Sequence, residues 1–180
     1  REVSGYLFGE WNTNLLTHSQ NAQVESLVQR GLKTFYYPPG QRKCWSFLTP
    51  IASLSVSIAQ PENELPADFG GLYGNMTFAS AGASYKPLRQ ITDSELRASQ
   101  ISEATTSITP EYFSIRSKTT DNTSAQRYEV VFFPTPFLGV PTITYRYKVS
   151  PAALSSSATV PYGSDLHAET MRQAMIAHAA

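Results

Sequence analysis

The sequence predicts an α+β fold, with helices toward both ends of the chain and an antiparallel β-rich region between them. Three observations support this prediction. An apolar stripe at helical spacing crosses residues 19–36, apolar and polar residues alternate in residues 128–132 and 143–149, and a second amphipathic segment follows residue 163. Because side chains recur every 3.6 residues on a helix and every two on a strand, the change of period separates the two kinds of structure.

The chain length suits one compact unit with two parts. At 180 residues it fits one domain, or one domain with a small satellite. We expect residues 1–40 and 163–180 to form a helical bundle part. Residues 41–162 are expected to form the β-rich part.

The composition excludes several classes of protein. Charged residues make up only 16% of the chain, and 14 basic side chains balance 14 acidic ones. This balance argues against a nucleic-acid binder with a large basic patch, because phosphate neutralisation dominates such binding. A single cysteine, Cys44, excludes an intrachain disulfide and a cysteine-based zinc site. No apolar run approaches the roughly 18 residues that a membrane span requires.

The N-terminal part contains two predicted helices. Residues 1–9 are expected to form a short helix, and residues 12–21 a polar loop with Thr17 or Ser19 as candidate N-caps. The second helix, residues 19–36, is defined by apolar residues at i, i+3, i+4, i+7, i+8 and i+11: Val24, Leu27, Val28, Gly31, Leu32 and Phe35.

Two residues, Gly31 and Pro38, bear on the packing and on the end of the second helix. An interior glycine costs about 1 kcal/mol relative to alanine, so Gly31 indicates either a close-packed neighbouring helix or a neutral accident. Pro38 ends the helix because it disfavours the α conformation at Tyr37.

The middle of the chain predicts mainly strands. Leu54, Val56 and Ile58 alternate with serines, the pattern of a half-buried strand. Further strands are expected at residues 73–79, 87–92 and 112–116, with a loop over residues 61–68. Thr92 and Glu95 form a capping-box pattern at the start of a short helix, residues 93–100.

Two alternating segments, residues 128–132 and 143–149, flank a connection rich in proline and glycine. This pattern predicts an antiparallel hairpin. After a polar stretch, Ser164 or Asp165 can cap a last helix. Its shared face carries Ala168, Met171, Met175 and His178.

No residue pattern indicates an active site. His167 and His178 lie about 16 Å apart on a continuous helix, too far to share a metal, and His18 has no candidate co-ligand. Cys44 is interpreted as a small buried thiol. Asp93 and Glu95 are explained by helix capping. We therefore predict no catalytic residue, no cofactor and no metal.

The aromatic and apolar residues are expected to serve packing or interfaces. The residues selected for this role are Leu27, Leu32, Phe35, Tyr36, Tyr37, Trp45, Phe69, Phe133, Phe137, Tyr145 and Tyr147.

The chain carries a series of short motifs in a fixed order: residues 1–11, the helix ending in Phe-Tyr-Tyr-Pro-Pro at 35–39, Trp-Ser-Phe-Leu at 45–48, Leu-Pro-Ala-Asp-Phe at 65–69, Met-Thr-Phe at 76–78, Phe-Phe-Pro-Thr-Pro at 132–136, Thr-Tyr-Arg-Tyr at 144–147 and His-Ala-Glu at 167–169. In this order they resemble the head–tail connector (adaptor) proteins of tailed bacteriophages. The similarity spans nearly the whole chain.

This resemblance implies a structural virion protein with no enzymatic turnover, assembled in the host cytoplasm and located at the head–tail junction. Such proteins form rings, often of twelve copies, beneath the portal protein. Tail or head-completion proteins would be further partners. DNA would pass through the lumen without sequence-specific contacts, and no membrane would be involved.

Two other functions stay open at this stage. The first is a carbohydrate-binding tail or fibre module, which requires an exposed coplanar row of aromatic rings. The second is a small hydrolase with a site formed on assembly, whose candidate residues are Glu62, Asp68 and His167.

Overall fold

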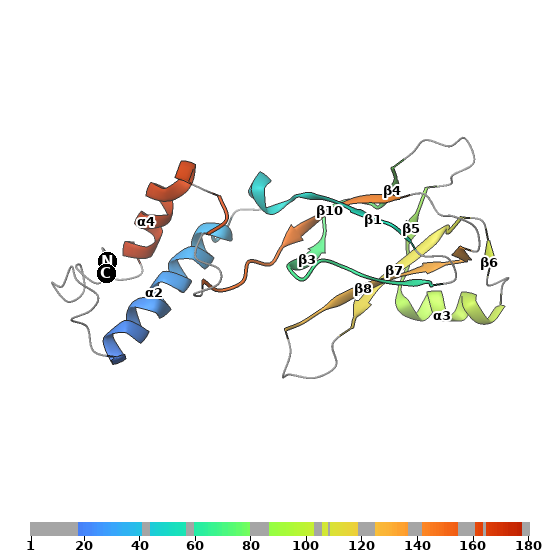
Figure 1. The fold of residues 1–180 in the computed structure, drawn as a ribbon, viewed down its shortest axis with the longest axis horizontal. Coiled ribbons are helices and arrows are strands. Elements are labelled where there is room, and N and C mark those ends of the chain that lie inside the picture. Colours follow the sequence, from blue (N-terminus) through green and yellow to red (C-terminus); the bar gives the residue numbers. More distant parts are fainter. Residues whose placement is uncertain are drawn as a thin grey trace. The chain divides into compact units, whose positions relative to one another are not determined.

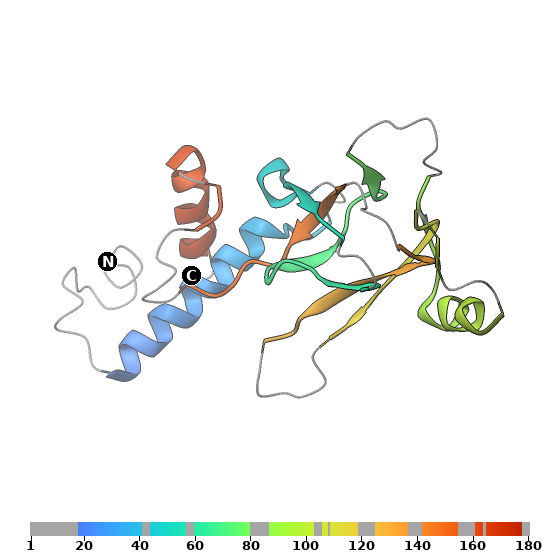
Figure 2. The ribbon, with the colours of Figure 1, turned by 45° about the vertical axis from the view of Figure 1, so that its right-hand side comes forward.

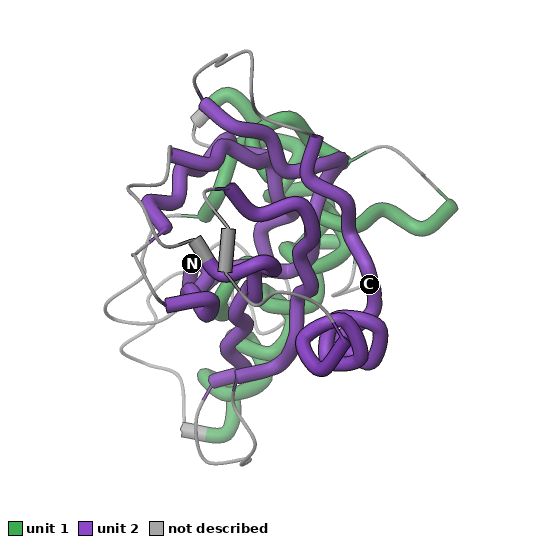
Figure 3. Tube along the Cα trace, turned by 90° about the vertical axis from the view of Figure 1, so that its right-hand side faces the viewer, with its two compact units in different colours: residues 1–48, 151–180 green, residues 49–150 purple. Residues whose placement is uncertain are grey.

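The structure is a computed structural model of the 180-residue chain. It describes residues 18–40, 44–56, 60–79, 87–102, 106–107, 109–118, 125–136, 142–154, 161–163 and 165–177. The chain divides into two compact units, residues 1–48 with 151–180 and residues 49–150 (Figure 3). We call them the helical unit and the β unit. The α+β fold is confirmed, with helices toward the termini and a central β region.

The helical unit contains α2 (His18–Tyr36) and α4 (Ala168–Ala177), together with the 3₁₀ turns η2 (Ser46–Leu48) and η3 (Asp165–His167). The predicted helix at residues 19–36 is confirmed. Ser19 lies inside it and is not its N-cap, so the polar-loop prediction is wrong for residues 18–21. A polar composition did not prevent the helix from extending there. The predicted helix at residues 1–9 lies outside the described residues.

Gly31 marks the contact between α2 and α4. A Cβ atom placed on Gly31 would lie 2.5 Å from Met175 Cα and 2.8 Å from Met175 N. Real Cβ atoms do not approach backbone atoms so closely. The close-packed-helix interpretation of Gly31 is therefore confirmed, and the glycine permits the helices to touch at backbone level.

The β unit contains two four-stranded sheets. In the first, β1 (Ile51–Leu54) and β3 (Phe69–Leu72) flank β10 (Ile143–Val149), and β4 (Thr77–Phe78) also pairs with β10 (Figure 1). All these pairs are antiparallel.

The strand predicted at residues 73–79 is wrong in extent. Gly74 has φ of +89°, a conformation outside the extended region, so the chain breaks between β3 and β4. The alternation predicted around Leu54 is also displaced toward the N-terminus. β1 begins at Ile51, and Val56 is buried beyond its end.

The second sheet has the strand order β2-β8-β7-β5. It consists of β2 (Glu62–Glu64), β8 (Tyr128–Phe133), β7 (Tyr112–Ser117) and β5 (Arg89–Gln90). Only the β5–β7 pair is parallel. The segment that contains β2 was predicted as a loop, and this prediction is wrong. The strand forms because residues 62–64 pair with β8, and a local sequence pattern does not reveal that pairing. A separate pair joins β6 (Thr106–Ser107) to β9 (Thr135–Pro136).

The predicted hairpin is wrong. Both of its strands exist as β8 and β10, but β8 pairs with β2 and β7, whereas β10 pairs with β1, β3 and β4. In the described part of the proline-rich connection, β9 follows β8 and pairs with β6. Four consecutive residues of β8, from Val130 to Phe133, are buried, so this strand is covered on both faces. It therefore lacks the one-sided alternation of a solvent-facing hairpin.

The helix α3 (Asp93–Ser102) belongs to the β unit and lies against the second sheet (Figure 2). Its predicted capping box is confirmed: the Thr92 N–H donates to Glu95 Oε2 at 2.8 Å, and the Glu95 N–H donates to Thr92 Oγ1 at 3.3 Å. Leu96 packs with Val131 and Phe133 in a buried cluster. A local cap and the buried Leu96 cluster thus help to hold this helix on the sheet.

Candidate functional site

The end of α2 is held by an aromatic cluster of Phe35, Trp45, Phe47 and His167. The Phe35 and Trp45 rings are stacked with centroids 5.2 Å apart, and the His167 ring lies 5.2 Å from Trp45 and 5.3 Å from Phe47. The Trp45 indole Nε1–H donates to the Phe35 carbonyl oxygen at 2.8 Å. Since helix termini leave carbonyls without intrahelical partners, this bond both caps α2 and fixes the chain after the two prolines.

The two tyrosines that follow Phe35 have different environments. Tyr36 is buried, and burial raises the pKa of its phenol, an effect partly offset by a hydrogen bond with the Tyr162 backbone. Tyr37 is 47% exposed, while its N–H continues the helix by donating to the Lys33 carbonyl. Tyr36 therefore belongs to the interior of the helical unit, and Tyr37 to its surface.

The C-terminal segment packs into the same unit at two points, Gly163 and Leu154, and Leu154 is bound by Gln29 of α2. Gly163 has φ of +103°, and a Cβ there would lie 2.9 Å from Met171 Cε and 3.2 Å from the Phe47 ring. The Gln29 side chain both donates to the Leu154 carbonyl and accepts from the Leu154 N–H. These contacts join the two ends of the chain within the helical unit.

A second aromatic group lines the buried face of the first sheet. Tyr145 and Tyr147 alternate along β10, and Tyr147 stacks on Phe69 with centroids 5.7 Å apart. The Tyr147 hydroxyl donates to Asp68 Oδ1 at 3.0 Å. Burial, followed by the nearby Asp68 charge, raises the pKa of Tyr145 to about 12. Asp68 is thus part of a packing contact.

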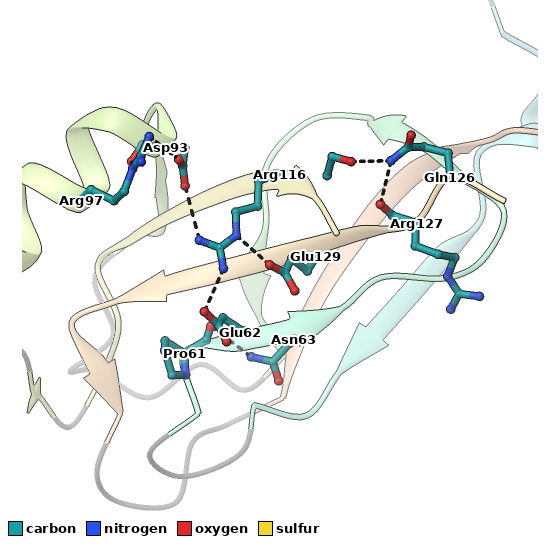
Figure 4. Close-up of polar contacts among 10 residues, drawn as sticks. Pro61, Glu62, Asn63, Asp93, Arg97, Arg116, Gln126, Arg127 and Glu129 are labelled. Carbon is teal, nitrogen blue, oxygen red and sulfur yellow. Dashed lines mark hydrogen bonds and ion pairs between the residues drawn. The ribbon is translucent and has the colours of Figure 1, made fainter. Parts of the chain in front are cut away.

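Arg116 on β7 is the centre of an ion-pair network across the second sheet (Figure 4). Its guanidinium lies 2.7 Å from Glu129 Oε1 on β8 and 2.8 Å from Glu62 Oε1 on β2. Asp93, at the start of α3, lies 3.7 Å from the same guanidinium. The hydrogen bond to Glu129, which is the largest effect, raises the pKa of Arg116 despite partial burial. One cation therefore links two neighbouring strands and the first residue of α3.

Glu64 of β2 and two cations just beyond the ends of β7 and β8 repeat this pairing. Glu64 forms ion pairs with Lys118 and Arg127, and these neighbours lower the pKa of its carboxyl, the Lys118 hydrogen bond most strongly. The two carboxylates of β2 therefore join this three-residue strand to the neighbouring part of the sheet through ion pairs. This arrangement explains Glu62 and Glu64 without an acid–base function.

The residues considered for chemistry are not arranged as an active site. Among the described residues, no group of three or more His, Cys, Asp or Glu side chains could hold a metal ion. His167 packs among aromatic rings. Cys44 is half-buried. His18 and His178 have no described side chains.

The comparison with known families identifies the chain. The family model described as SU10 adaptor protein matches residues 2–180, and so spans both units. The chain belongs to this family. No protein with a curated description matches the chain. The resemblance to phage adaptor proteins is therefore confirmed, and the protein is a structural component of a phage.

The structure places most residues selected for packing in the interiors of the adaptor. Those buried are Leu32, Phe35, Tyr36, Phe69, Phe133, Tyr145 and Tyr147. Leu27 and Trp45 are half-buried, Tyr37 is exposed, and Phe137 lies outside the described residues. Among the described helices of the adaptor, none is long and apolar enough to cross a membrane.

Two features of the adaptor were missed by the sequence analysis. One is the Arg116 network, because its partners lie 13 and 54 residues away and the strand registers were unknown. The other is a set of exposed apolar side chains: Ile51, Tyr73, Ile101, Tyr162 and Leu166. Isolated apolar residues in polar segments were the only available signal for this set.

Proposed function

We propose that this adaptor is a head–tail connector subunit, which forms a ring beneath the portal protein and joins the DNA-filled head to the tail. The observation that carries the proposal is the family match over residues 2–180, which includes both units. We expect twelve copies in the ring, as in the connector proteins that the sequence resembles. Tail or head-completion proteins would then bind the opposite side of the ring from the portal.

The helical unit is proposed to make the contacts between copies. Leu166, at the turn before α4, is 91% exposed, and Tyr37 and Tyr162 of the same unit are 47% and 40% exposed. Large apolar side chains at such exposures are frequent at assembly surfaces. The β unit is proposed to reach the portal or the tail.

The charge balance supports passage of DNA through the ring without tight binding. The formal charge of the chain is zero, and seven of the charged side chains on the second sheet and at the start of α3 are paired in ion pairs: Glu62, Glu64, Asp93, Arg116, Lys118, Arg127 and Glu129. Since phosphate binding grows with the number of free cations, such a lumen would let DNA move.

Co-expression with the portal protein of the same phage tests the proposal. Native mass spectrometry and electron microscopy of the product should show a ring of adaptor subunits on the portal. An adaptor that stays monomeric in the presence of the portal would refute the proposal. A glycan array with the monomer tests the carbohydrate-binding alternative in parallel.

A matched pair of variants tests which unit forms the ring. Leu166→Ser and Ile101→Ser each replace one side chain that is 90% or more exposed, in the helical unit and the β unit respectively. Leu166→Ser should reduce the fraction of complete rings, whereas Ile101→Ser should leave that fraction unchanged. Equal effects of the two variants would contradict the assignment of the ring contacts to the helical unit.

A further inference from the structure

The outer face of the first sheet of the β unit carries a row of three exposed side chains across the strands. Ile51 on β1 is the cross-strand partner of Arg146 on β10. On the other edge of β10, the Tyr73 N–H donates to the Arg146 carbonyl, which continues the register beyond the Leu72–Tyr147 pair. Arg146 is therefore flanked on both sides by large apolar residues.

All three side chains of this row are accessible. Ile51 is 61% exposed, Tyr73 is 46% exposed, and Arg146 is exposed. With strands about 5 Å apart, the row spans about 10 Å. Arginine and tyrosine are enriched among the residues that dominate binding energy at protein interfaces. A row that combines them with an exposed isoleucine has the composition of an interface centre.

Lys148 adds a second cation beside the row. It lies two residues from Arg146 on the same face of β10, at a spacing of about 7 Å. Its cross-strand partner is Gly71, where an added Cβ would meet no atom within 4 Å. The space next to the lysine is therefore open, because no side chain from β3 fills it.

Among the residues that the structure describes, this face carries no acidic side chain that could neutralise these cations. In the described part of the chain, neither Arg146 nor Lys148 takes part in an ion pair. The other described residues that the registers place on this face are Ser53, Thr77 and Thr144. Asp68, just before β3, accepts a hydrogen bond from Tyr147, whose side chain lies on the opposite face. This contrasts with the second sheet, where Arg116 has three carboxylate neighbours.

We infer that this face, consisting of Ile51, Tyr73, Arg146, Lys148 and the gap over Gly71, docks an acidic segment of another virion protein. Carboxylates of that segment would bind Arg146 and Lys148, and an apolar side chain of it would contact Ile51 and Tyr73. A planar guanidinium binds a carboxylate through two parallel hydrogen bonds, which gives the site its geometric preference. The inference rests on the proposed function, because it assumes that the adaptor contacts other virion proteins and adds the chemistry of one such partner.

DNA fits this face less well than an acidic protein segment does. Nucleic-acid affinity depends on the number of phosphates neutralised, and the described residues of this face include two cations, Arg146 and Lys148. A sugar–phosphate backbone also offers little apolar surface to cover Ile51 and Tyr73. The combination of two free cations with two exposed apolar groups therefore favours a peptide.

Binding of the full-length adaptor to an array of overlapping 15-residue peptides tests the inference. The peptides cover all the other virion proteins of the same phage. Wild-type adaptor should bind peptides that combine Asp or Glu with apolar residues, and Arg146→Glu with Lys148→Glu should weaken that binding about ten- to hundredfold. Arg89→Glu is the matched control, because Arg89 is an exposed cation of the other sheet. It should leave peptide binding within about twofold.

Two further measurements complete the test. Replacing the acidic residues of a bound peptide by lysine should restore binding to the charge-reversed adaptor and abolish binding to wild type. A 20-base-pair duplex is titrated in parallel. The inference is overturned if no acidic peptide binds, if binding survives charge reversal, or if the duplex binds through Arg146 and Lys148 more tightly than any peptide. Ring formation on the portal is measured separately, so that failure of the proposed function remains distinguishable.

Discussion

Replacement of Gly31 by alanine is expected to destabilise the helical unit, although alanine is the better helix former. A Cβ at this position would lie 2.5 Å from Met175 Cα, 2.8 Å from Met175 N and 2.9 Å from Met175 Cγ. Ordinary carbon–carbon contacts are about 3.5–4.0 Å, so α2 and α4 must separate locally by about 1 Å. Two of the three atoms are backbone and cannot rotate away.

The expected magnitude is a balance of two effects. Overpacking costs about 1–3 kcal/mol, and a clash with backbone belongs to the upper part of that range. The higher helix propensity of alanine returns about 1 kcal/mol. We therefore expect Gly31→Ala to lower the free energy of unfolding by about 1–2 kcal/mol.

Urea denaturation of the full chain, followed by far-ultraviolet circular dichroism, measures this change. Ser26→Ala is the matched control, because Ser26 lies on the exposed face of the same helix and its replacement should stabilise by about 0.5 kcal/mol. Truncation of Met175 to alanine in the Gly31→Ala background should rescue stability only partly, since the backbone clash persists. If Gly31→Ala stabilises the protein as Ser26→Ala does, the two helices do not touch at Gly31.

Three further predictions concern the contacts of single side chains. Trp45→Phe should lower the free energy of unfolding by about 1 kcal/mol, because it retains a ring but removes the hydrogen bond to Phe35; an unchanged urea midpoint would contradict that role. Arg116→Met should destabilise the β unit by about 1–2 kcal/mol, since Glu129 loses its partner, and Arg116→Lys should restore only part of the loss, as measured by the same denaturation. Burial raises the pKa of Tyr145 to about 12, so this tyrosine ionises in the unfolded chain before it does in the folded protein as pH rises above about 10. The free energy of unfolding should therefore fall by about 2 kcal/mol between pH 10 and pH 12, and this decrease should be smaller in Tyr145→Phe.

The Trp45 and Gly31 contacts give the Phe-Tyr-Tyr-Pro-Pro segment a specific structural role. Phe35 lies in the aromatic cluster, and its carbonyl accepts the Trp45 indole N–H. The segment therefore does more than end a helix, because it determines where the chain continues after the prolines.

The local features were predictable because their physical causes lie within a few residues. The stripe from Val24 to Phe35 defines α2 through the 3.6-residue period. Thr92 and Glu95 define the start of α3 through two hydrogen bonds that span three residues. The glycine in the α2 stripe allowed either a close neighbouring helix or a neutral accident, and only the Met175 contact decided between the two.

The strand partners were not predictable in the same way. The alternation of β10 correctly identified a strand, but alternation shows only which side chains share a face of the sheet and does not show which strand pairs with it. β8 and β10 are adjacent in the sequence and nevertheless belong to different sheets. The Arg116 network and the row around Arg146 depend on those registers, and so neither could be seen before the strands were paired.

By itself, the sequence determined the α+β class, the two well-defined helices α2 and α3, the strand character of β7, β8 and β10, and the resemblance to phage adaptors. Each of these depends on periodicity, on capping or on short motifs in a fixed order. Only the tertiary structure decided the sheet topology, the contact of Gly31 with Met175, and the position of Arg146 between Ile51 and Tyr73. Such contacts join residues that are far apart in the chain. Their formation depends on the competition among many possible pairings, which no local pattern encodes.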